Sequence, residues 1–262
     1  MKTNEQLKSE VRNKYASIVE KPGHSCGCGS GANVVFEVDY SKIEGYNPDA
    51  DYGLGCGVPT GGAGIKEGDT VLDLGSGAGN DAFVARRLVG DRGKVIGIDM
   101  TEAMIEKARA NNANVGYANV EFRLGEIENL PVESACVDVV LSNCVLNLVP
   151  DKRKAFAEIS RVLKPGGHFS ISDIVTNVSL PERLREAAAL YAGCVSGAVP
   201  REEYLGIISE SGFTNIEVRH EHPITIPDYI LEGTDPDDVE MLKSANVAVL
   251  SVTVTGTKPA GI

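Results

Sequence analysis

The sequence predicts an α/β protein built on a doubly wound, mostly parallel sheet of seven strands. From Asp69 onward, short apolar runs alternate with segments of helical periodicity, which is the pattern of strands joined by crossover helices. The stretch Asp73 to Gly79 places three glycines between the first apolar run and the first helical segment. The chain has 262 residues, of which 42% are hydrophobic, so it can form one large domain with additions at both ends.

The elements of the first half follow from these patterns. A helix is expected over 4–20, because Leu7, Val11 and Ile18 recur on one face. Residues 21–64 are irregular and rich in glycine, and structured segments of that length are often functional. Thr101 is the expected N-cap of a helix. The remaining elements are strands over 70–74, 94–98, 120–124 and 137–141, and a helix over 80–89.

The second half continues the alternation and then changes. Asp151 is expected to cap a helix that ends at the turn Pro165-Gly-Gly167, and a strand follows over 168–174. Beyond this point the pattern predicts two helices and then two closing strands. Their ranges are 181–191 and 201–211 for the helices, and 214–219 and 247–256 for the strands.

Charge and composition exclude several classes of partner. The net charge of −12 repels a phosphate backbone, so a nucleic-acid substrate is not expected. The sequence has no polybasic membrane patch, no apolar run long enough to span a bilayer and no signal-peptide pattern, so we expect a cytoplasmic protein without membrane partners. In that compartment, the six cysteines are expected to be reduced, ligating or catalytic.

The glycine loop indicates a nucleotide-type cofactor. Its spacing differs from the dinucleotide fingerprint because the third glycine comes one residue early, and Asp99 ends the next strand where a carboxylate can accept ribose hydroxyls. Together with Leu163-Lys-Pro-Gly-Gly167, this loop resembles that of class I S-adenosylmethionine (SAM) methyltransferases, which have a Rossmann-like fold. A nicotinamide-binding domain is the alternative. The resemblance implies that SAM is bound by Asp73, Gly75, Ser76, Gly77, Asn80, Asp99, Met100, Glu126, Ile127 and Asn143.

Three cysteines lie in distinctive contexts, namely Leu-Gly-Cys56-Gly, Ser-Asn-Cys144-Val-Leu-Asn-Leu and Gly-Cys194-Val-Ser-Gly-Ala. Cys144 follows the fourth expected strand, at the edge of the sheet where doubly wound folds bind ligands. Each thiol taken alone could be a small buried apolar residue. A shared site for a soft atom explains all three, because thiolates select soft acceptors. None of the four histidines lies in the context of a general base.

With these motifs, the chain resembles the arsenite SAM methyltransferases from about residue 10 onward. In that family three such cysteines hold trivalent arsenic, which implies Cys56, Cys144 and Cys194 as ligands. A further N-terminal cysteine assists, and Cys26 and Cys28 are the candidates here. Cys136 matches no motif and is interpreted as structural. Half of a zinc site at His24, Cys26 and Cys28 is the competing interpretation, although no second half with metal spacing exists.

The resemblance implies that thiolate-bound arsenic attacks the SAM methyl group in line, which detoxifies arsenite. A glutathione- or thioredoxin-like thiol reductant is then needed as co-substrate, and a thioredoxin-type protein is a possible partner. The implied organisation is an N-terminal helix and cysteine-rich substrate segment over 1–68, a SAM-binding core over 69–175, and arsenic-site helices with the closing strands over 176–262.

Two other functions fit the same features. The first is SAM-dependent methylation of a small carbon or oxygen acceptor, such as a quinone or a sterol, and turnover without arsenic would reveal it. The second is a non-catalytic metalloid-binding protein, which would bind arsenite and release no S-adenosylhomocysteine. The intact glycine loop argues against this second function.

Overall fold

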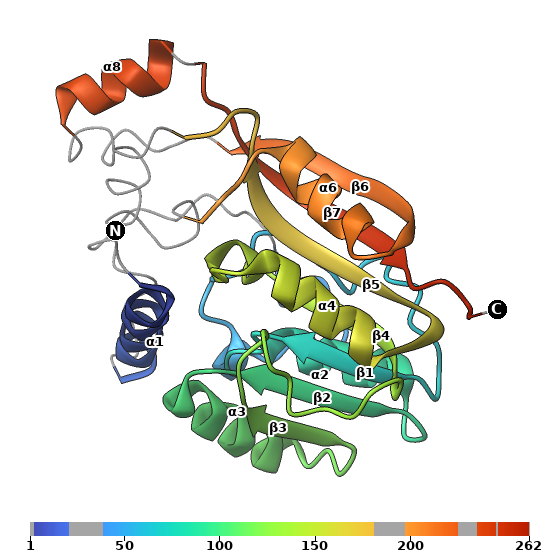
Figure 1. Cartoon of the computed structure of the whole chain (residues 1–262). Coiled ribbons are helices and arrows are strands. Elements are labelled where there is room, and N and C mark those ends of the chain that lie inside the picture. The colour runs from blue at the N-terminus through green and yellow to red at the C-terminus, as the bar shows by residue number, and fades with distance from the viewer. Residues whose placement is uncertain (1–2, 21–38, 181–196, 225–234, 245, 262) are drawn as a thin grey trace.

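One sheet of seven strands organises the molecule, with the strand order β3-β2-β1-β4-β5-β7-β6 (Figure 1). The computed structural model describes residues 3–20, 39–180, 197–224, 235–244 and 246–261. The five strands β1 to β5 run parallel, and β7 lies antiparallel between β5 and β6. The predicted doubly wound, mostly parallel sheet is therefore confirmed.

The strands are β1 (Thr70–Leu74), β2 (Lys94–Asp99), β3 (Val120–Leu124), β4 (Val137–Asn143), β5 (Leu163–Thr176), β6 (Thr214–Ile224) and β7 (Val249–Thr257). The described helices are α1 (Asn4–Glu20), α2 (Asn80–Val89), α3 (Glu102–Val115), α4 (Lys152–Val162), α6 (Arg201–Glu210) and α8 (Pro236–Ser244). Short 3-10 helices are η1 (Tyr40–Lys42), η2 (Pro48–Ala50) and η3 (Leu146–Leu148).

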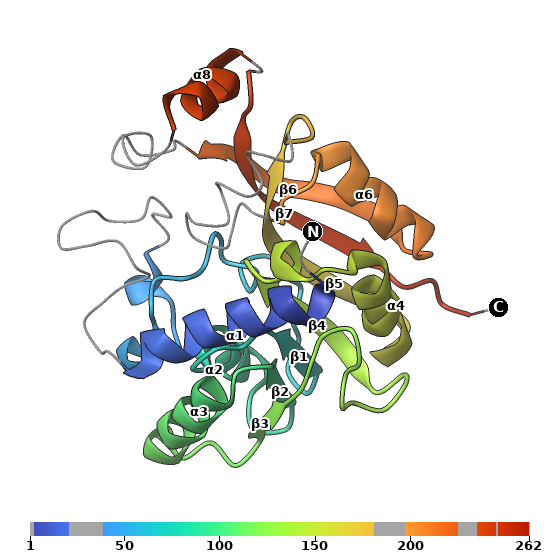
Figure 2. The same ribbon diagram turned by 60° about the vertical axis from the view of Figure 1, so that its left-hand side comes forward.

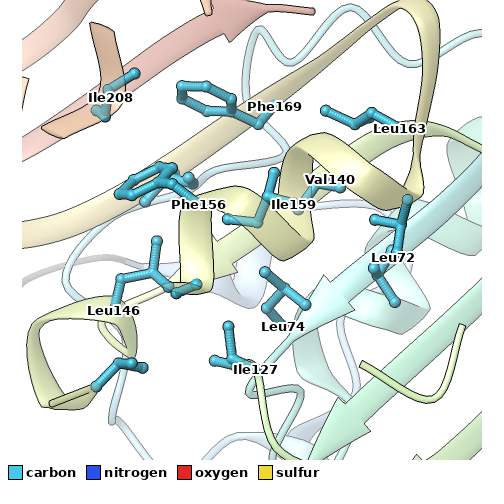
Figure 3. Close-up of a cluster of buried hydrophobic side chains, with 14 of the residues drawn as sticks. Leu72, Leu74, Ile127, Val140, Leu146, Phe156, Ile159, Leu163, Phe169 and Ile208 are labelled. Atoms are coloured by element: carbon cyan, nitrogen blue, oxygen red, sulfur yellow. The ribbon is translucent and has the colours of Figure 1, made fainter. Parts of the chain in front are cut away.

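Both faces of the central strands are buried, which explains why apolar residues occur on both faces of each strand. Leu72 and Leu74 of β1 face a cluster that includes α4 and α6, whereas Val71 faces a second cluster with α2 and α3. Figure 3 shows Phe156 and Ile159 of α4 among the side chains of the first cluster. Helices thus cover both faces of the sheet. The carboxyl ends of the strands remain uncovered by these helices and can form a site.

The strand order places a switch point between β1 and β4. From β1 the chain proceeds outward through β2 and β3, and it then returns to the other side of β1 as β4. Crossover connections that leave in opposite directions open a crevice at the carboxyl ends of the two strands. Helix α1 lies beyond this edge of the sheet (Figures 1 and 2).

Several local expectations need correction. The strand predicted over 168–174 begins at Leu163, because residues 164–167 bulge between the pairs Val137–Leu163 and Val139–His168. Thr101 is at the N-cap of α3 but its side chain makes no capping hydrogen bond. Helix α8 was not predicted, and the helix predicted over 181–191 lies outside the described residues.

Residues 39–64 pack on the sheet, so they belong structurally to the core. Ala50 and Ala63 are buried in the cluster of α2, and Cys56 is buried near β5 and β7. Among the helices within the described ranges, none is both long enough and apolar enough to cross a membrane.

Candidate active site

A cavity lies at the switch point, and most of the predicted cofactor residues line it. Nine of the ten do so, namely Gly75, Ser76, Gly77, Asn80, Asp99, Met100, Glu126, Ile127 and Asn143. The tenth, Asp73, is buried behind the glycine loop and is not part of the lining. The cavity therefore lies at the carboxyl ends of β1 to β4, and residues at these ends or directly after them form much of its lining.

The glycine loop needs glycine for a close approach as well as for its turn. Gly75 has φ of 65°, and a Cβ there would lie 2.3 Å from Cγ2 of Val145. The loop therefore packs bare backbone against the chain that leaves β4. This contact joins the cofactor loop to the segment that carries Cys144.

Asp99 holds the cofactor loop from the neighbouring strand. Its Oδ2 accepts a hydrogen bond from the backbone N–H of Gly77 at 3.0 Å, and its Oδ1 accepts one from Thr101 at 2.8 Å. Burial raises the pKa of Asp99, although these two N–H groups act in the opposite direction. Each carboxylate oxygen can accept a second hydrogen bond, so the acceptors that ribose hydroxyls need are present.

Acidic groups surround the loop and suit a cationic ligand. Burial raises the pKa of Asp73 well above its ordinary value, and the nearby carboxylates Asp81 and Asp99 add to this effect. Oδ2 of Asp73 is buried and has no hydrogen-bond partner within the described part of the chain. SAM carries a sulfonium and an ammonium group, so the carboxylates and the orphaned acceptor fit its charge.

Asn143, at the end of β4, is the centre of a hydrogen-bond network. Its Nδ2 lies within hydrogen-bond distance of the hydroxyl of Tyr40, the carbonyl of Gly57 and Oδ2 of Asp81, at 2.8 to 2.9 Å. Its Oδ1 accepts the backbone N–H of Cys56 at 3.0 Å. Asn143 therefore connects the cofactor cavity to the first predicted arsenic ligand.

Asp81 completes this network from the first turn of α2. Burial raises its pKa to about 6, although hydrogen bonds from Asn143 and Tyr40 act to lower it. Tyr40 donates to Oδ1 of Asp81, and burial together with this carboxylate raises the pKa of Tyr40. Sequence reasoning missed both residues because their contacts join distant segments.

Helix α1 also contributes to the site, which the sequence did not reveal. Lys8, Val11 and Tyr15 line the cavity. Lys8 forms ion pairs with Glu126 at 2.8 Å and with Glu128 at 2.6 Å, and its side chain is only 11% exposed. Glu126, predicted as a SAM-binding residue, therefore also forms an ion pair that holds α1 at the cavity. The amphipathic pattern of residues 4–20 was the available signal.

Two of the predicted arsenic ligands are brought together. Cys56 and Cys144 are 1% and 3% exposed and belong to one buried cluster with Ile174, Ala198 and Val249. Cys144 also lines the cofactor cavity. Its backbone has φ of 60°, which is uncommon without glycine, and its N–H donates to the carbonyl of Ser172 at 2.8 Å. Such backbone conformations cluster at functional sites.

The other thiols divide into two groups. Cys26, Cys28 and Cys194 lie outside the described residues, although Ala198 of the buried cluster follows Cys194 by four positions. Cys136 is half-buried at the start of β4, where its Sγ donates to the carbonyl of Glu133 at 3.1 Å, away from the cavity. In the described ranges, no three His, Cys, Asp or Glu residues are grouped to hold a metal ion.

Comparisons with known proteins match the chain to methyltransferases. The model of a methyltransferase domain family matches residues 65–222. An arsenite methyltransferase of Halobacterium salinarum is 41% identical over 261 residues, covering 93% of this chain and 66% of that protein. The human arsenite methyltransferase is 32% identical over 241 residues, covering 87% of this chain and 63% of that protein. The chain thus spans about two thirds of the length of these curated relatives.

A solved structure gives the same match. The X-ray structure of an arsenic(III) S-adenosylmethionine methyltransferase from Chlamydomonas reinhardtii is 38% identical and superimposes with a TM-score of 0.69. The match covers 79% of this chain and 68% of that one.

Proposed function

Because the chain belongs to the arsenite S-adenosylmethionine methyltransferase family, we propose that it methylates trivalent arsenic. The observation that carries the proposal is the placement of Cys144. This residue lines the cofactor cavity and shares a buried cluster with Cys56. A thiol-bound arsenic atom at that position is next to the cofactor and shielded from water. The substrates are arsenite and methylarsenite, and the reaction serves detoxification.

The ligands of arsenic are Cys56, Cys144 and Cys194, as in the family. Thiolates suit this role because trivalent arsenic is a soft acceptor. Cys26 and Cys28 assist by delivering arsenic to the buried cluster. Asn143 contributes by fixing the backbone of Cys56, since it accepts that N–H at 3.0 Å.

Cofactor binding uses the acidic and glycine-rich side of the cavity. Asp99 accepts the ribose hydroxyls, and Glu126 and Ile127 flank the adenine. Asp81, which lines the cavity, faces the positive charge, and Asp73 lies buried behind the glycine loop. Bound SAM supplies an electrophilic methyl group. The protein's own contribution is to hold both reactants in one desolvated site, and such positioning can lower a barrier by roughly 7 to 11 kcal/mol.

Methyl transfer to arsenic leaves the metalloid oxidised by two electrons, which a reductant must return. The lone pair of trivalent arsenic forms the new As–C bond in line with the breaking C–S bond, whose electron pair stays on sulfur as a neutral thioether. Arsenic becomes formally pentavalent. Two thiols return two electrons to it and form a disulfide, so a glutathione- or thioredoxin-like reductant is required as co-substrate.

Arsenite-dependent release of S-adenosylhomocysteine tests the proposal. The protein is incubated with SAM and a thiol, with and without arsenite, and the release is measured by chromatography. We expect release only when arsenite is present. Release without arsenite, stimulated by a quinone or a sterol, would instead assign a carbon or oxygen acceptor. Arsenite binding with no release would indicate a metalloid-binding protein, and either outcome would overturn the proposal.

A further inference from the structure

One face of strands β5 and β7 carries hydroxyl groups where a buried sheet is normally apolar. Ser170 and Ser172 of β5, and Ser251 and Thr253 of β7, are all 5% exposed or less. Ser172 pairs directly with Thr253 across the two strands, and Ser170 and Ser251 are each two residues away, so all four side chains share one face.

These hydroxyls bind the backbone of the segment that contains Cys56. Ser251 Oγ donates to the carbonyl of Cys56 at 2.7 Å, and Ser170 Oγ donates to the carbonyl of Pro59 at 2.7 Å. Between them, Gly57 lies so close to the strand that a Cβ there would be 2.5 Å from Ser172 Oγ. The hydroxyl-bearing face of β5 and β7 therefore binds the backbone of residues 56–59.

Cys56 is held at both of its backbone polar groups. Its N–H donates to Oδ1 of Asn143 at 3.0 Å, and its carbonyl accepts from Ser251 at 2.7 Å. One partner lies at the end of β4 and the other on β7. Because the peptide groups on both sides of the Cα atom are fixed, the direction of the Cα–Cβ bond is fixed, which limits the positions that the thiol can occupy to those allowed by rotation about χ1.

We propose that Ser251 is a positioning residue that sets the Cys56 thiol for arsenite. This inference rests on the proposed function, in which Cys56 is a ligand of arsenite. Methylarsenite already carries one methyl group and needs only two thiols, so Cys144 and Cys194 suffice for it. Ser251 does not line the cofactor cavity, so its replacement is expected to act on the arsenic ligand Cys56 and to leave SAM binding unchanged. Ser251 therefore supports the methylation of arsenite and not that of methylarsenite.

The test compares two substrates in Ser251→Ala. We expect the rate with arsenite to fall by about 10- to 100-fold, since a buried carbonyl loses its donor and Cys56 loses its fixed orientation. The rate with methylarsenite should stay within about twofold, and SAM affinity measured by calorimetry should not change. Ser170→Ala is a second variant, whose carbonyl partner lies three residues further on. In this variant too, the rate with arsenite should fall more than the rate with methylarsenite, but by a smaller factor than in Ser251→Ala.

Thr255→Val is the matched control. Thr255 lies on the same strand and face, but its hydroxyl contacts Arg219 at 3.4 Å rather than the Cys56 segment. This variant should match the wild type with both substrates. Cys56→Ser is the reference for complete loss of the thiol.

Failure of the inference and failure of the proposed function give different results. If the wild type methylates neither substrate, the proposed function fails. If Cys56→Ser separates the two substrates but Ser251→Ala and Ser170→Ala lower both rates equally, or neither, then the positioning role of Ser251 is wrong and the proposed function stands.

Discussion

Replacing Asp99 by alanine tests the assignment of the cofactor cavity. The carboxylate accepts two backbone hydrogen bonds, from Gly77 at 3.0 Å and from Thr101 at 2.8 Å, and it is expected to accept the ribose hydroxyls of SAM. A hydrogen bond to a charged group contributes about 1.5 to 3 kcal/mol. Since about 1.4 kcal/mol is tenfold in affinity, we expect Asp99→Ala to raise the Kd for SAM by about 10- to 100-fold.

The stability of this variant should change much less than its affinity. Burial raises the pKa of Asp99, so ionising this carboxylate costs more free energy in the folded protein than in the unfolded chain. Its removal relieves that cost and offsets the loss of two acceptors for backbone N–H groups. Loss of SAM binding with a nearly unchanged melting temperature is therefore the expected signature.

Titration calorimetry with SAM is the assay, and Asp151→Ala is the matched control. Asp151 also accepts a backbone N–H, from Lys154 at 3.0 Å at the start of α4, but it does not line the cavity. Its replacement should cost about 1 kcal/mol of stability and leave the Kd for SAM unchanged. A folded Asp99→Ala protein with wild-type Kd would refute the assignment of Asp99 to the ribose.

Three further predictions concern the thiols, the pH dependence of SAM affinity, and the packing of Gly57 beside Cys56. Cys144→Ser should abolish arsenite methylation because a hydroxyl is a hard ligand, whereas Cys136→Ser should match the wild type; activity in the first variant would exclude the thiol site. Asp81, with a pKa of about 6, is ionised above that pH and attracts cationic SAM, so affinity should fall as pH is lowered through 6. Calorimetry on Asp81→Asn should show this dependence lost, and a persisting fall would assign it to another group. Gly57→Ala should lower the arsenite rate and cost about 1 to 3 kcal/mol in thermal unfolding, because its Cβ would overlap Ser172; a wild-type rate would contradict that packing.

The fold was predictable because its signals are local. The central strands are buried on both faces, so β1 and β4 are rich in apolar residues, and glycines mark the turn after β1. The start of β5 was wrong because the glycine pair was interpreted as a terminator. In the structure, the segment around Gly167 bulges and pairs with Lys258 near the end of the chain, which no local pattern encodes.

The site was predictable where spacing defines it. The glycine loop and Asp99 follow consecutive strands, so their meeting at one edge of the sheet follows from the topology. The two hydrogen bonds that hold the backbone of Cys56 could not be predicted in this way. Asn143 is 87 positions and Ser251 is 195 positions from Cys56, and the side chains meet only because β4 and β7 are both neighbours of β5.

Mass spectrometry of arsenic after incubation with arsenite, a thiol and SAM bearing a deuterated methyl group tests the central claim most directly. We expect methylated arsenic that carries the intact deuterated methyl group, formed together with S-adenosylhomocysteine in equal amount per methyl transferred. Cys144→Ser should form neither product while still binding SAM. Arsenic that remains inorganic although S-adenosylhomocysteine is released would contradict the claim, since the methyl group would then have another acceptor.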